Sequence, residues 1–158
     1  MTSAVPGAID ALLALVTTAA AALPPDADTN IPPVQVFEAD PISTDQDFVA
    51  VAYSPNEGQP AVTRSPTVAD AALRRNAEIF EIHSLISAWR GDENVKTVRN
   101  RAEAILEAIE AALVNDSKLG GAVAQALLSE STYTPSQSGQ GPTADISFVV
   151  TCKAWRTP

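Results

Sequence analysis

Apolar side chains recur at helical spacing in two parts of the chain. The first part runs from about Pro6 to about Leu23, and its large apolar residues are Ile9, Leu12, Leu13, Val16 and Leu23. This spacing predicts an amphipathic helix, and Pro6 suits its first turn. A second and clearer helix is predicted from 93 to about 115. Its expected buried stripe is Val95, Val98, Ala102, Ile105, Ile109 and Ala112 or Leu113.

Alternation of apolar and polar positions predicts strands elsewhere. The segments "VQVFEAD" (34–40) and "DFVAVAYS" (47–54) are expected to be short strands, and "AEIFEIHSLISAW" (77–89) a long one. The last strand has the cleanest alternation, from Asp145 to Trp155. Residues 122–133 fit either a short helix or a strand, and their second half favours a strand.

Two stretches lack either periodicity. Residues 55–76 and 134–143 are rich in proline, glycine and small polar residues, which predicts long loops. The order helix, strands, helix, strands then predicts a single α+β domain over residues 1–158. We expect an antiparallel or mixed sheet of about four to five strands with both helices on one face. Neighbouring copies of the chain would explain how the other face and the edges of the sheet stay soluble.

Charge is distributed unevenly along the chain. The formal net charge is −9, and residues 1–63 hold eight acidic residues and no lysine or arginine. Such a chain repels phosphate, which disfavours a DNA-binding role. Arg64, Arg74 and Arg75 either solvate the start of a strand or contact an acidic surface, such as residues 26–47 of a neighbouring copy.

The second predicted helix carries a strip of small side chains beside its apolar and charged sides. Ala104, Ala108 and Ala111 form a smooth strip there, narrow enough for another element to approach closely. We therefore treat this strip as a candidate contact between subunits.

The residue types that carry catalysis or bind metals do not form a known catalytic or metal-binding motif in this sequence. The chain has one histidine, His83, which is expected to be partly exposed, and one cysteine, Cys152, which is expected to be buried and inert. Residues 26–30 open like a calcium-binding loop, but Ile31 and Phe37 stand where glycine and glutamate are required. We therefore expect no enzyme, no cofactor and no metal site.

The N-terminal apolar run raises the question of export or membrane insertion. It lacks a basic segment before the run, and Asp10 interrupts it. We therefore expect an amphipathic helix of a soluble protein with no membrane contact.

The tripeptide Arg90-Gly91-Asp92 matches a motif that many extracellular adhesion proteins present to receptors. Here it falls between the long predicted strand and the second predicted helix. Gly91 allows the chain to turn, and Asp92 can accept backbone N–H bonds as the helix N-cap. A strand-to-helix connection therefore explains the tripeptide better than adhesion, which would need an exported protein.

The order of these features resembles the tail terminator (tail completion) proteins of long, flexible-tailed bacteriophages. The resemblance spans nearly the whole chain and lies in the order, length and texture of the segments. They are "AIDALLALVTTAAAAL", "VQVFEADP", "DFVAVAYSPNEG", "SAWRGDENV", "RNRAEAILEAIEAALVNDSKLGGAV" and "ADISFVVTCKAW".

The resemblance implies a structural virion protein at the head-proximal end of the tail, assembled in the host cytoplasm as a hexameric ring. Its partners would be itself, the major tail tube protein and a head-side connector or head-closure protein. The ring would cap the tube and end its polymerisation, and DNA would pass through the lumen without sequence-specific binding. The candidate subunit, tube or connector contacts are Arg64, Arg74, Arg75, Ala104, Ala108 and Ala111.

Other functions remain open at this point. The chain could be another neck component, such as a head-closure or connector protein, or a tail tube subunit. A small ligand-binding or enzymatic α+β domain is the alternative from a different class, and it would require a pocket with convergent polar groups.

Overall fold

The computed structural model describes residues 2–23, 34–41, 47–65, 68–70, 75–89 and 94–156. In this part of the chain a mixed sheet of seven strands is joined by helices α1 (Val5–Ala21) and α2 (Val95–Asn115) and a short 3-10 helix, η1 (Leu119–Gly121). The strands are β1 (Gln35–Glu38), β2 (Phe48–Val51), β3 (Val62–Arg64), β4 (Val68–Asp70), β5 (Arg75–Trp89), β6 (Gln125–Ser138) and β7 (Gly141–Arg156). The predicted α+β class is confirmed, with more strands than the four to five expected.

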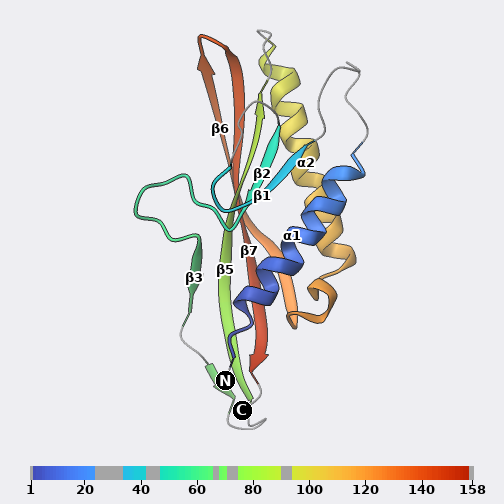
Figure 1. Cartoon of the computed structure of the whole chain (residues 1–158), viewed down its shortest axis with the longest axis vertical. Coiled ribbons are helices and arrows are strands. Elements are labelled where there is room, and N and C mark those ends of the chain that lie inside the picture. The colour runs from blue at the N-terminus through green and yellow to red at the C-terminus, as the bar shows by residue number, and fades with distance from the viewer. Residues whose placement is uncertain are drawn as a thin grey trace.

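The sheet is built around three long strands. Its order is β1-β2-β5-β7-β6, and β3 and β4 pair with β5 farther along the same edge as β2. The β1–β2 pair is parallel and the other pairs are antiparallel. Figure 1 shows β5, β6 and β7 as a long ribbon, with α1 and α2 together on one side of it. Both helices therefore cover one face, as predicted.

The core lies between this face and the helices. Burial alternates strictly along β7 from Gly141 to Ala154, and the even-numbered residues of β5 and β7 point to the helices. The inward face of β5 includes Phe80, Ile82 and Ile86, whose side chains have no exposed surface. Opposite them, α2 contributes its stripe from Val98 to Leu113. Each large apolar side chain buried in this way stabilises the fold by roughly 1.5–3 kcal/mol.

The buried face of α1 differs from the predicted one. The residues that it buries recur every three or four positions and include alanines: Val5, Ala8, Leu12, Val16 and Ala20. The predicted Ile9, Leu13 and Leu23 are only partly buried at the margin of the core. The large side chains correctly predicted a helix. They misplaced the centre of its buried face, because small residues such as alanine are favoured where a helix packs closely.

The hairpin of β6 and β7 corrects the prediction of a flexible loop at 134–143. Backbone pairing runs on to Ser138 opposite Gly141, which leaves a tight turn at residues 139 and 140. Side chains from Thr134 to Gln137 are exposed, so polar residues suit this part of the hairpin. Strand β6 begins at Gln125, which confirms the strand expected in the second half of 122–133.

The predicted loop at 55–76 is also wrong in part. Residues 54–61 carry no strand, but β3 and β4 lie within the predicted loop and both pair with β5, which itself begins at Arg75. The composition of this stretch indicated a loop because β3 and β4 are each only three residues long.

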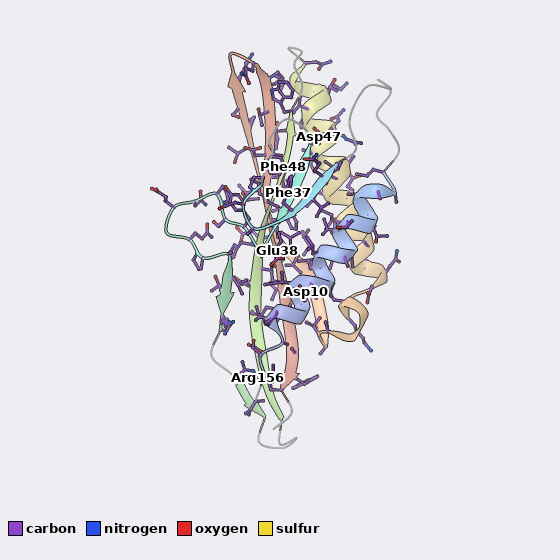
Figure 2. All side chains as sticks on the ribbon, viewed as in Figure 1. Asp10, Phe37, Glu38, Asp47, Phe48 and Arg156 are labelled. Atoms are coloured by element: carbon purple, nitrogen blue, oxygen red, sulfur yellow. The ribbon has the colours of Figure 1, made fainter. Side chains whose placement is uncertain are left out.

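Two buried carboxylates join the layers at opposite ends of the molecule, where Figure 2 labels Asp47 and Arg156. At one end, Asp47 lies 3.2 Å from Nε of Arg101 on α2 and accepts a hydrogen bond from the backbone N–H of Trp89 at the end of β5. The side chain of Asp47 has no exposed surface. Removing one partner of such a pair would leave the other charge buried without compensation.

At the other end, Glu78 on β5 connects the start of α1 to the end of β7. Its Oε1 and Oε2 accept hydrogen bonds from Nη2 and Nε of Arg156, at 2.8 and 3.0 Å. The same carboxylate accepts bonds from the Ser3 hydroxyl and from the backbone N–H of Ala4. Burial alone would raise the pKa of Glu78, but these donors outweigh it and the pKa is lowered.

The N-cap of α2 is Asn94. The helix begins at Val95, and the side-chain oxygen of Asn94 accepts a hydrogen bond of 3.3 Å from the backbone N–H of Thr97. The predicted N-cap was Asp92, two residues earlier. Residues 90–93, with the Arg90-Gly91-Asp92 tripeptide, lie outside the described residues.

Replacing Asn94 by alanine tests the observed cap. Because this change removes the acceptor for the Thr97 N–H group, we expect it to lower the free energy of unfolding by about 1 kcal/mol. Urea denaturation followed by tryptophan fluorescence would measure the effect. Asp92→Ala is the comparison, and a larger loss in that variant than in Asn94→Ala would contradict the assignment.

Replacing Glu78 by glutamine tests the second carboxylate. At neutral pH the change should cost roughly 1.5–3 kcal/mol of stability, because hydrogen bonds to a charged group are lost. The folded pKa lies below the ordinary value of 4.5. The stabilisation from the carboxylate is therefore present above that value and is lost as pH falls through the folded pKa.

The measurement is the difference in unfolding free energy between the wild type and Glu78→Gln at several pH values from 7 to 3. The difference should shrink at the acidic end. Glu107→Gln, at an exposed position of α2, is the matched control. A difference that stayed constant over this range would mean that the Glu78 carboxylate does not stabilise the fold as an anion.

Candidate interaction surfaces

Two of the three predicted contact arginines, Arg64 and Arg75, lie among the described residues. Arg64 is the last residue of β3 and its side chain is exposed. Arg75 is the first residue of β5, and Arg74 lies outside the described residues. Among the described residues Arg64 has no ion pair, so the positive charge at this position is available to a partner.

The predicted alanine strip borders a groove between the two helices. Ala104 and Ala108 are half-buried and Ala111 is exposed. Ala108 and Ala111 line an open groove of about 590 Å³, whose other wall is α1, with Leu15 and Ala19 among its residues. The strip therefore admits a close neighbour, as expected, and that neighbour is α1 of the same chain. A contact of the strip with another copy stays a prediction.

The predicted environments of the single histidine and the single cysteine are confirmed. His83 is half-buried in β5, and its Nε2 lies 3.3 Å from the Thr63 hydroxyl. Cys152 has no exposed surface, and burial raises the pKa of its thiol to about 12. Within the described residues no three His, Cys, Asp or Glu side chains are placed to hold a metal ion. The helices described here include none with the length and apolar character needed to cross a membrane.

The face of the sheet opposite the helices, here called the outer face, carries an open hollow of about 360 Å³. Its floor is formed by β5 and β7, with Leu85, Asp145 and Val149 among the residues. The segment that follows β2 forms one wall, which includes Tyr53, and β6 forms the other, which includes Glu130. The side chains of the hollow are mostly polar, and Asp145 and Glu130 give it negative charge.

A small apolar cluster adjoins this hollow. Phe48, Ala50 and Leu85 are buried together on the outer face, with Phe37 and Tyr53 packed against them. The rings of Phe37 and Phe48 meet edge to face with 6.2 Å between their centres, and Figure 2 labels both. The cluster fixes the position of Tyr53, and with it one wall of the hollow.

A β-bulge in β6 determines which of its side chains reach the hollow. Leu128 lies opposite Val150, and after the bulge Glu130 lies opposite Val149. The extra residue, Ser129, donates a hydrogen bond to the Val149 carbonyl and accepts one of 2.7 Å from the Thr151 hydroxyl. Glu130, Thr132 and Thr134 therefore face outward.

The outer edge of β6 is the third candidate surface. In the described part of the chain β6 pairs with β7 alone, so one side of this 14-residue strand is an edge of the sheet. The bulge and Pro135 interrupt the later part of that edge, and such features hinder pairing with another strand. The first part, Gln125 to Leu128, carries neither of them.

Exposed apolar side chains flank this first part. Leu127 is 43% exposed on one side of the edge, and Val114, near the end of α2, is 76% exposed on the other. Both line a small hollow of about 230 Å³ between α2 and β6. Single exposed apolar side chains are normal, so Val114 and Leu127 gain their interest from lying together beside an open strand edge.

Sequence reasoning missed Asp145, Glu130, Val114 and Leu127. The alternation of the last strand did put Asp145 on the polar face, but it gave no sign that β6 and the segment after β2 would enclose it. Val114 and Leu127 are ordinary residues of a helix and a strand, and only the end of α2 beside the sheet edge brings them together.

Neither protein-family models nor curated protein sequences gave a match to this chain.

Cys152 provides a test of the packing of β7. Because its thiol is buried and its pKa is about 12, the folded protein should hold about a thousandfold less thiolate than an exposed cysteine at the same pH. Labelling with a thiol reagent at pH 8 should be very slow in the native state and rapid in urea. Rapid native labelling would show that β7 separates readily from the helices.

Proposed function

We propose that this chain is a structural subunit that assembles with copies of itself into a ring, as a phage tail terminator does. The observation that carries the proposal is the Gln125–Leu128 edge of β6 with exposed Val114 and Leu127 beside it. This surface combines a sheet edge with exposed apolar area, which is the combination that edge-to-edge association uses, although the Ala126 N–H there already donates to the Ser117 carbonyl at 2.6 Å.

The sheet also supports a head-to-tail arrangement. Its two edges differ: β6 is long and antiparallel to its neighbour, whereas β1 has four residues and is parallel to β2. A contact of one copy's β6 edge with a different surface of the next copy is heterologous. Heterologous contacts close into a ring when the rotation between copies permits it.

The role in a tail follows from the resemblance noted in the sequence. In this proposal the ring caps the tail tube, ends its polymerisation and joins the tail to the head-side connector. The net charge of −9 suits a lumen through which DNA passes without adhering, because like charges repel. A head-closure protein or a tube subunit would share these properties, so the experiment must separate them.

The assembly is tested first with matched charge insertions. Native mass spectrometry of the wild type at micromolar concentration should give six copies. Val114→Glu and Leu127→Glu place a carboxylate in the proposed contact and should shift the protein to monomers without unfolding it, because both sites are exposed. Val95→Glu is the control, since Val95 is 46% exposed at the start of α2 and an acidic residue is favourable there.

The role is tested by adding the assembled protein to the polymerising major tail tube subunit of the same phage. A terminator should shorten the tubes seen by electron microscopy and should lie at one end of them. A ring that binds the connector and leaves tube length unchanged would indicate another neck component. A stable monomer would contradict the proposal and favour a small ligand-binding domain.

A further inference from the structure

We propose that the hollow on the outer face of the sheet is a binding site for a guanidinium group, supplied by an arginine of a second copy of the chain. That a second copy supplies the arginine rests on the proposed function. That the hollow binds a guanidinium group does not depend on it.

The ionisable groups of the hollow favour a cation. Glu130 and Asp145 line it from β6 and β7, and His83 contributes from β5. No lysine or arginine is among the lining residues, so nothing within the described part of the hollow balances the two carboxylates. A cationic group that enters such a concave site meets less competing water than it would on a flat surface.

Asp145 has the strongest need for a partner. Its Oδ1 is shielded from solvent and has no hydrogen-bond donor in the described structure. An oxygen in this state has lost the stabilisation that water gives and has gained none from the protein. A positive group in the hollow would offset this charge through space, since Asp145 lines the hollow although its Oδ1 has no accessible surface.

The remaining walls suit a guanidinium better than a compact ammonium. Tyr53, Leu85 and Val149 provide aromatic and aliphatic surface beside the two carboxylates. A guanidinium is planar, packs on aromatic rings and donates several hydrogen bonds in fixed directions, whereas an ammonium retains water more strongly. The volume of about 360 Å³ lies in the range of sites that hold small groups.

Arg64 is the arginine of this chain that is suited to occupy the hollow of a neighbour. Among the described arginine side chains, Arg99 contacts Asn100, and Arg101 and Arg156 hold the buried carboxylates. Arg64 is exposed at the end of β3. A contact between Arg64 of one copy and Asp145 of the next joins two different surfaces, as a heterologous ring requires.

The site chemistry is tested on the whole protein with acetyl-arginine amide as the probe. In a titration followed by backbone amide NMR, saturable shifts should appear at Glu130, Asp145 and Ser147. Asp145→Asn keeps the shape but removes the charge, so it should weaken binding about tenfold or more. Asp10→Asn is the matched control, because Asp10 is exposed on α1 in the helix layer and its loss should leave the affinity unchanged.

Three results of this titration would overturn the proposed chemistry. The first is the absence of saturable shifts on the outer face. The second is equal affinity in the wild type and in Asp145→Asn. The third is stronger competition by calcium ions than by acetyl-lysine amide, which would indicate a site for a metal ion.

The source of the guanidinium is tested by charge exchange. Asp145→Arg and Arg64→Asp should each lower the fraction of assembled protein in native mass spectrometry, and the double variant should restore it. An assembled wild type whose single variants assemble equally well would overturn the second-copy source while leaving the ring intact. A monomeric wild type that still binds the arginine probe would instead contradict the proposed function and the second-copy source, and would leave the site chemistry standing.

Discussion

The long antiparallel pairing of β5 with β7 is the constraint on which the other layers depend. It runs without a break from Asn76 opposite Arg156 to Trp89 opposite Thr143. Because the register is continuous, every second residue of both strands faces the helices. The remaining residues face outward, and some of them form the floor of the outer hollow. One ladder therefore determines the core, the polar face and the separation between them.

The buried carboxylates act at the two ends of this ladder. Asp47 joins the end of β5 to Arg101 on α2, and Glu78 joins the other end of β5 to the start of α1 and to Arg156. The helix layer is thus attached to the sheet by directional contacts at both ends and by apolar packing between them. Loss of either partner in these contacts would leave a charge buried without compensation, so the helix layer is held to the sheet at both ends.

Much of the fold could be predicted from periodicity, because the signal is strongest where one face of an element is buried. Strand β7 and helix α2 were predicted closely for that reason. The hairpin end at 134–143 was missed because its polar residues lie in strands held by backbone pairing, which leaves no hydrophobic pattern. The hollow could not be predicted, since Asp145, Glu130 and Tyr53 come from three separate segments that only the folded sheet brings together.

The bulge at Ser129 makes the length of β6 as important as its composition. If Ser129 were paired in a continuous register and not bulged, Glu130 and Thr132 would turn towards the helices, and Tyr133, which now packs against the core, would turn towards the outside. The two faces of the distal hairpin would then exchange their side chains although the sequence stayed the same. Homologous chains that keep this surface should therefore either keep the bulge or lack its one extra residue, because both arrangements leave Glu130 opposite Val149.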